Sequence, residues 1–127
     1  MSRKIAAAAI TATGIAALVL AGAGSASAMQ SGYRILSPGQ QYCVSQYAAY
    51  QVRADGFATG QGAKFKLQLA GTTVTGTASP GLVTNWAAEL RTAYGTFHAP
   101  GTYTACATNN GTTNTTVQMQ LKTDGEF

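Results

Sequence analysis

The sequence predicts an all-β domain: an antiparallel sandwich of two sheets with about seven strands and one disulfide bond. Three observations lead to this prediction. Thr, Tyr, Val and Gly are abundant after residue 28, and these are strand and turn residues. Charged residues make up only 9% of the 127 residues, so the Lys and Glu that usually cover exposed helix faces are scarce. Several segments alternate apolar and polar side chains with the period of two of a half-buried strand.

The first 28 residues have the three parts of a secretory signal peptide, of a form expected in bacteria. Arg3 and Lys4 precede an uncharged apolar run over 5–20, and Ala26-Ser27-Ala28 is a small-residue cleavage site. We therefore expect cleavage after Ala28 and secretion of a single domain over 29–127. The apolar run is short for a membrane span, and no second hydrophobic run follows it, so we expect no membrane insertion of the mature chain. Arg3 and Lys4 account for two of the four net positive charges, which leaves the mature chain closer to neutral.

The expected strands follow one another at short intervals along the mature chain. They cover residues 33–36, 41–53, 63–69, 72–77, 83–92, 101–108 and 113–122. In 63–69 and 113–122 the alternation is strict, which predicts one buried face and one solvent-exposed face. The segment 41–53 is longer and less regular, and we expect it to break near Ala48.

Turn-forming residues separate these segments. Asn109-Asn110-Gly111 predicts a hairpin, and Ala99-Pro100-Gly101 predicts a type II turn because Pro fixes φ and Gly accepts positive φ. Asp55-Gly56 also predicts a turn, at the start of a loop that would end at Gly60-Gln61-Gly62. The last four residues, from Asp124, are expected to be a frayed tail.

The segment 85–94 is compatible with two interpretations. As a strand it places Trp86, Ala88 and Leu90 on one face. As a short helix it stacks Trp86, Leu90 and Tyr94, and the fold would then be α+β. We favour the strand because the rest of the chain has β character and Trp86 would help to seal a sandwich core.

Cys43 and Cys106 are the only two cysteines, and an exported chain meets an oxidising environment, so we expect a disulfide between them. The segment 101–106, Gly-Thr-Tyr-Thr-Ala-Cys, resembles the penultimate strand of immunoglobulin-like domains. The resemblance implies a two-sheet sandwich and carries no functional residue. It departs in one respect: Tyr103 lies three residues before Cys106 instead of two, so the cysteine points away from the core. Cys43 also reads as outward-facing, so the bond should tie neighbouring strands, or a strand and an edge segment, instead of the two sheets.

Few side chains are available for chemistry, so we expect no enzymatic activity. His98 is the only imidazole, and Asp55 and Glu89 are the only carboxylates outside the tail. Glu89 is expected to pair with Arg91 two positions away on a strand. These residues do not form a metal-binding pattern, and we expect neither a metal nor a cofactor. Basic residues could form a mild stripe, but the low net charge argues against a nucleic-acid partner. They are Lys64, Lys66, Arg53, Arg91 and Lys122.

The remaining candidates point to binding. Tyr and Gln form adaptable recognition surfaces, and the sequence offers several in 40–51 and in the hairpin near residue 110. The candidate binding residues are Tyr42, Tyr47, Tyr50, Gln46, Asn109 and Asn110. We therefore expect a non-catalytic module, monomeric or weakly oligomeric, that binds an extracellular protein or carbohydrate.

The alternative function is a secreted inhibitor of an extracellular enzyme, which would present a rigid exposed loop. Phe97-His98-Ala99-Pro100 and Ser79-Pro80-Gly81 are the candidate loops. A protruding ordered loop would favour the inhibitor. An aromatic strip with polar neighbours would favour a carbohydrate or surface binder.

Overall fold

The computed structural model describes residues 28–125 and 127, and this part of the chain forms eight β-strands. The predicted signal peptide lies outside these residues, except for Ala28 at the start of the first strand. In chain order the strands are β1 (Ala28–Leu36), β2 (Gln41–Ala48), β3 (Gln51–Ala58), β4 (Lys64–Leu69), β5 (Thr72–Thr73), β6 (Asn85–Arg91), β7 (Gly101–Thr108) and β8 (Thr115–Thr123). No helix in the described part of the chain is long and apolar enough to cross a membrane.

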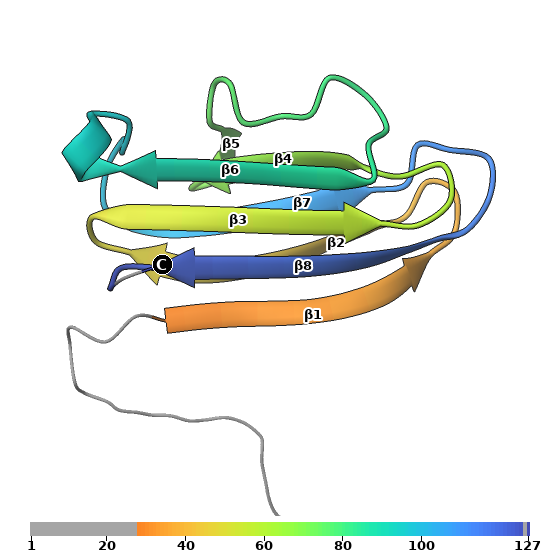
Figure 1. Ribbon diagram of the computed structural model, residues 1–127, viewed down its shortest axis with the longest axis horizontal. Coiled ribbons are helices and arrows are strands. Elements are labelled where there is room, and N and C mark those ends of the chain that lie inside the picture. The colour runs from red at the N-terminus through yellow and green to blue at the C-terminus, as the bar shows by residue number, and fades with distance from the viewer. Residues whose placement is uncertain (1–27, 126) are drawn as a thin grey trace, which may run out of the picture.

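The strands form two four-stranded antiparallel sheets that pack face to face (Figure 1). Sheet A has the strand order β1-β8-β3-β6, and sheet B has the order β2-β7-β4-β5. The pairs β1–β8, β2–β7, β3–β6 and β4–β5 are those of one long hairpin folded over on itself. This is the order of an eight-stranded jelly roll. In immunoglobulin domains the first two strands pair within one sheet, whereas here β1 and β2 lie in different sheets.

The two-sheet β-sandwich that the composition predicts is confirmed, and the strand boundaries refine it. The segment expected at 41–53 forms β2 and β3, which separate just after Ala48, as its irregular pattern indicated. The strand expected at 72–77 is only two residues long. The helix considered for 85–94 is wrong: β6 covers most of the segment, and only Thr92–Tyr94 forms a 3₁₀ turn.

The turn predicted at Asp55-Gly56 is wrong. Both residues lie inside β3, where Gly56 is in register with Trp86 on one side and Met119 on the other. The glycine meets a packing requirement here, because a Cβ on Gly56 would lie 2.6 Å from Cδ1 of the buried Phe65 ring. Phe57 therefore belongs to the same strand, and its side chain is on the outer face of sheet A.

The core lies between the sheets and is filled by the inward-facing residues of each strand. Its largest fully buried apolar side chains are Tyr103, Phe65, Leu36, Leu67 and Leu121. Trp86 covers one side of this core, with its ring stacked on Phe65 at a centroid distance of 5.3 Å. Its indole Nε1 donates a hydrogen bond to the carbonyl of Thr77 at 2.7 Å. The prediction that Trp86 helps to seal the sandwich is confirmed.

The Cys43–Cys106 disulfide is confirmed, and it lies on the outer face of sheet B. The two residues are register partners on β2 and β7, with their Cα atoms 4.1 Å apart. The bond therefore joins neighbouring strands of one sheet, in agreement with the outward orientation that the strand alternation predicted.

Asp124 does not belong to a frayed tail. Its carboxylate accepts hydrogen bonds from the backbone N–H groups of Ala49 at 3.0 Å and Tyr50 at 2.9 Å. These bonds close the turn between β2 and β3, so the end of β8 is fixed to the rest of the sandwich.

Candidate functional site

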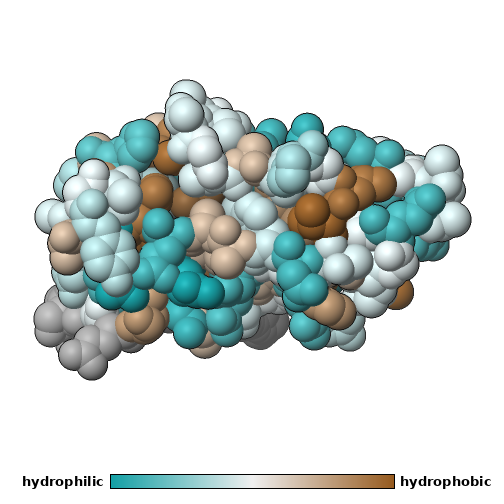
Figure 2. Space-filling model, turned by 45° about the horizontal axis from the view of Figure 1, so that its top comes forward, coloured by the Kyte–Doolittle hydropathy of each residue, from teal (hydrophilic) through white to brown (hydrophobic). Residues whose placement is uncertain are grey.

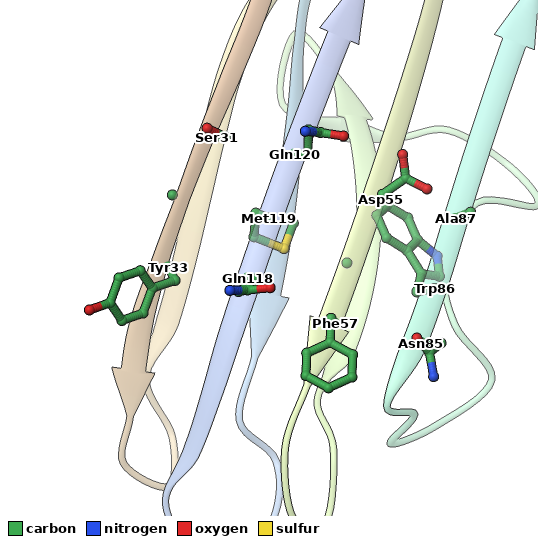
Figure 3. A pocket seen from close by; sticks show the side chains of 12 residues that line it. Ser31, Tyr33, Asp55, Phe57, Asn85, Trp86, Ala87, Gln118, Met119 and Gln120 are labelled. Carbon is green, nitrogen blue, oxygen red and sulfur yellow. The ribbon is translucent and has the colours of Figure 1, made fainter. Parts of the chain in front are cut away.

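A groove of about 740 Å³ lies on the outer face of sheet A, and all four strands of the sheet contribute to it (Figure 3). Its lining residues are Ser31, Gly32, Tyr33, Asp55, Gly56, Phe57, Asn85, Trp86, Ala87, Gln118, Met119 and Gln120. A volume between about 300 and 1,000 Å³ is typical of small-ligand sites. The groove is therefore the leading candidate for a binding site among the described residues.

Strand register builds the groove from two rows of outward-facing side chains. In the first row Tyr33 faces Gln118, which faces Phe57, and Phe57 faces Asn85. The second row, two residues along each strand, consists of Ser31, Gln120, Asp55 and Ala87. Neighbouring strands lie about 4.8 Å apart, so each row runs about 14 Å across the sheet. Figure 3 shows the aromatic rings of the first row on either side of Gln118.

Two of the three aromatic residues that line the groove are exposed. Tyr33 is 67% exposed and Phe57 is 44% exposed. Each projects from a strand that is hydrogen-bonded to β8, so the backbone beneath both rings is fixed. The single tryptophan, Trp86, also lines the groove, but its indole is held against Phe65 and Thr77. Tyr33 and Phe57 are therefore the rings that a ligand could contact face on.

The amides of the groove retain their hydrogen-bonding capacity. Gln118, Gln120 and Asn85 form no side-chain hydrogen bond to any residue that the structure describes. A neutral amide both donates and accepts hydrogen bonds. Three such groups, together with the Ser31 and Tyr33 hydroxyls, give the groove several directional contacts that no other described residue uses.

The only charged residue in the lining, Asp55, is already paired. Arg53 donates to both carboxylate oxygens of Asp55, from Nε at 3.0 Å and from Nη2 at 2.9 Å. The same guanidinium donates from Nη1 to Glu89 at 2.6 Å, and Glu89 also pairs with Arg91. These hydrogen bonds raise the pKa of Arg53 above its ordinary value, with the Asp55 bonds as the main cause. The hydrogen bond from Arg53 is also the main reason why the pKa of Glu89 is lowered. The predicted Glu89–Arg91 pair is present.

The tyrosines singled out in the sequence do not form one surface. Tyr42 and Gln46 alternate with the outward-facing residues of β2 and are half-buried on its inner side. The Tyr42 ring packs beneath Arg34, 4.9 Å from its guanidinium carbon. Tyr47 is on the outer face of sheet B. Tyr50 is in the β2–β3 turn, where its hydroxyl accepts a hydrogen bond from the Gly125 N–H at 2.7 Å.

Asn109 and Asn110 lie just beyond β7, in the connection to β8. The hairpin predicted here is wrong, because β7 and β8 belong to different sheets. The two asparagines differ in accessibility. Asn109 is 1% exposed, and its amide nitrogen donates to the carbonyls of Leu36 at 2.9 Å and Thr113 at 2.8 Å. It stabilises the turn and cannot be reached by a ligand, so its place among the candidate binding residues is not supported. Asn110 is exposed and lines a smaller recess of about 320 Å³ beside Lys64 and Lys66.

The candidate loop at 97–100 is held to β7 on both sides of His98. Phe97 packs on Tyr103, and the Tyr103 hydroxyl donates to the Ala99 carbonyl at 2.8 Å. Between these anchors His98 is exposed, and no hydrogen bond of its imidazole is found in the described part of the chain. The other candidate loop adheres to β4 through Ser79, whose hydroxyl accepts from the N–H of Phe65 at 2.9 Å.

The basic residues divide between the two outer faces instead of forming one stripe. Lys64 and Lys66 are on the outer face of sheet B. The remaining three belong to the outer face of sheet A, where Arg53 is bound by carboxylates. Within residues 28–125 and 127, no three His, Cys, Asp or Glu side chains come together in a group that could hold a metal ion.

Sequence reasoning missed most of the groove. The strand expected at 33–36 contained Tyr33 but did not extend to Ser31. Because a turn was predicted at Asp55-Gly56, Phe57 was not recognised as a strand residue. Gln118 and Gln120 were recognisable as the solvent-exposed face of a strand. Their position between two aromatic strands depends on long-range pairing, for which a single alternating segment gives no signal.

The fold and the groove together define a jelly-roll β-sandwich with a recessed outer sheet face. No protein-family model matches the chain, and no curated protein matches it in sequence.

Proposed function

We propose that the protein is a small exported binding module that catalyses no reaction and holds its ligand in the groove of sheet A. The observation that carries this proposal is the lining, in which exposed aromatic rings stand beside amides that bind no other described residue. Aromatic rings supply contact area at low entropic cost, and amides supply adaptable hydrogen bonds. This combination is typical of recognition surfaces.

The state of the charged groups favours binding over catalysis. A general acid or base must be free to exchange a proton with a substrate. Asp55 and Glu89 are both hydrogen-bonded to Arg53, and the hydrogen bond from Arg53 lowers the pKa of Glu89. Hydrolysis of a glycosidic bond generally uses two carboxylates on opposite sides of the bond, whereas the groove lining contains Asp55 alone.

Two features support an extracellular location in the medium or at the cell surface. The Cys43–Cys106 disulfide is of the kind that persists in oxidising compartments. The segment over 1–28 has the pattern of a signal peptide, which directs a chain to such a compartment.

A pull-down with matched variants tests the proposal. The full chain, expressed for export and purified from the medium, is immobilised and exposed to the culture supernatant and cell-wall material of its own organism. The groove variant combines Tyr33→Ala with Phe57→Ala. The control is Tyr47→Ala, which removes a tyrosine of similar exposure from the opposite outer face.

The expected result is retention of a component by the wild type and by Tyr47→Ala, and its loss in the groove variant. Retention that the groove variant shares would place the binding surface elsewhere. No retention above background with any of the three proteins would contradict a binding role.

The inhibitor function keeps one supporting observation, the anchored loop that presents His98 between Phe97 and Ala99. For an inhibitor, His98→Ala would abolish capture of a secreted enzyme, and the groove variant would leave that capture unchanged. The same pull-down therefore separates the two functions.

A further inference from the structure

We propose that the ligand of the sheet A groove is a segment of an uncharged polysaccharide, laid across the strands against Tyr33 and Phe57. This inference rests on the binding function proposed above and specifies its ligand class. It draws on the chemistry of the lining, its charge and its dimensions.

The chemistry of the lining matches both sides of a sugar ring. A pyranose presents a face of C–H groups and a rim of hydroxyls that donate and accept hydrogen bonds. The negative faces of Tyr33 and Phe57 attract the slightly positive C–H groups. Gln118 lies directly between the two aromatic residues in the first row, where its free amide can meet sugar hydroxyls.

The charge of the groove favours a neutral ligand. Asp55 is the only charged residue among the described lining residues, and Arg53 donates to both of its oxygens. The Arg53 guanidinium that could attract a polyanion is thus already shared between Asp55 and Glu89. Lys122 lies one row farther along β8, outside the lining. The described lining of the groove therefore offers no free cation or anion to a charged chain.

The dimensions favour a linear chain over a protein partner. Each row is about 14 Å long, runs perpendicular to the strands and ends at the two edges of sheet A. A stable protein interface buries about 800 Å² on each partner around an apolar centre. Here the positions along β8, in the middle of the sheet, are the amides Gln118 and Gln120. Figure 2 shows apolar patches separated by polar surface on the face in view.

Direct binding to defined polysaccharides tests this inference. The probes are a neutral set (cellulose, xylan, mannan, amylose and dextran) and an anionic set (polygalacturonate and hyaluronate). Affinity electrophoresis reports binding to each soluble polymer, and depletion from solution reports binding to cellulose. Fluorescence of Trp86, which lines the groove and is the only tryptophan, provides an independent readout with soluble fragments.

We expect at least one neutral polymer to bind, with an affinity that 1 M NaCl leaves unchanged because no ion pair is involved. Tyr33→Ala and Phe57→Ala should each weaken that binding by about tenfold, and Gln118→Ala should weaken it by a smaller factor. Tyr47→Ala should leave it unchanged. Circular dichroism of each variant confirms that the comparison is made between folded proteins.

Three results would overturn the inference: no binding to any neutral polymer, tighter binding to an anionic one, or equal loss of binding in Tyr47→Ala. If all polymers fail but the pull-down still retains a component through Tyr33 and Phe57, the glycan assignment falls and the binding function stands. If the pull-down fails as well, both fall.

Discussion

The two sheets of the sandwich share one core, but their outer faces differ in how they use their polar groups. On sheet B, facing side chains bind one another: the Ser45 and Thr104 hydroxyls lie 2.8 Å apart, and the Gln41 amide donates to Thr108 at 3.1 Å. The disulfide lies on the same face, between β2 and β7. On sheet A, the amides and rings of the groove have no such partners among the described residues.

This difference separates stability from recognition within one small domain. A face whose polar groups bind one another stabilises the fold and has little left to offer a ligand. Amides that remain free on a face do not stabilise the folded protein, since they bind water equally well in the folded and unfolded states. We therefore expect changes to the cross-linked and hydrogen-bonded groups of sheet B, and changes beneath the groove, to affect the free energy of unfolding. Changes in the groove lining should affect binding.

The largest expected effect comes from removing the cross-link of sheet B. Combining Cys43→Ala with Cys106→Ala releases residues 63 positions apart, which should lower the free energy of unfolding by about 4 kcal/mol. Urea unfolding followed by Trp86 fluorescence measures the change. Groove binding should persist in dilute buffer, where the variant remains folded. A loss of less than about 1 kcal/mol would mean that the bond constrains the unfolded chain little.

The next effect concerns the floor of the groove, where Gly56 lies over a buried ring. Gly56→Ala places a Cβ against Phe65, which cannot move without displacing Trp86, so we expect a loss of about 1–3 kcal/mol. Gly32→Ala is the matched control in the same sheet. Its Cβ meets only the outer end of the half-buried Tyr42 side chain, which can rotate away, so the loss should be smaller. Equal losses in urea unfolding would show that Phe65 does not set the requirement for glycine.

A smaller effect is expected from the charged cluster beside the groove. The pKa of Glu89 is lowered in the folded state, so its ion pairs stabilise the protein above the ordinary value of 4.5. That contribution is lost as the pH falls from there through the folded pKa. Glu89→Gln should therefore lower the free energy of unfolding by about 1 kcal/mol or less at pH 7, a small loss because Glu89 is partly solvated. The loss should shrink as the pH falls, because Glu89 of the wild type then becomes protonated. Urea unfolding of both proteins at several pH values measures the difference. A constant gap across the titration would show that ionisation of Glu89 contributes nothing.

The comparison of the two faces also shows what the sequence could and could not predict. The period of two correctly placed Cys43 and Cys106 outside the core, and so predicted a bond between neighbouring strands. It also identified Gln118 and Gln120 as outward-facing. These are properties of one strand at a time, and the positions of side chains along a strand determine them.

The groove depends on strand pairing, which the alternation within one strand does not specify. Tyr33 and Phe57 become neighbours because β8, from the far end of the chain, inserts between β1 and β3. The Asp55-Gly56 dipeptide has the local preference of a turn, but glycine is needed here because a larger residue would clash with Phe65 in the core. The local sequence therefore gave no signal for the neighbouring positions of Tyr33 and Phe57, and it gave the wrong signal for Asp55-Gly56. Tertiary packing determined both.

The smallest expected effect on stability is that of Tyr33→Ala, and it makes the sharpest comparison between the faces. The Tyr33 ring is 67% exposed, and its hydroxyl bonds to no other described residue, so the free energy of unfolding should change by less than about 0.5 kcal/mol. Tyr47→Ala on sheet B should change it equally little, and urea unfolding measures both. Only Tyr33→Ala should lose ligand. A loss of stability above about 1 kcal/mol in Tyr33→Ala would make the ring a structural element of β1, and its exposure would no longer indicate a ligand. An aromatic ring that adds nothing to folding, fixed beside free amides on a rigid strand, has its most direct physical explanation in contact with another molecule.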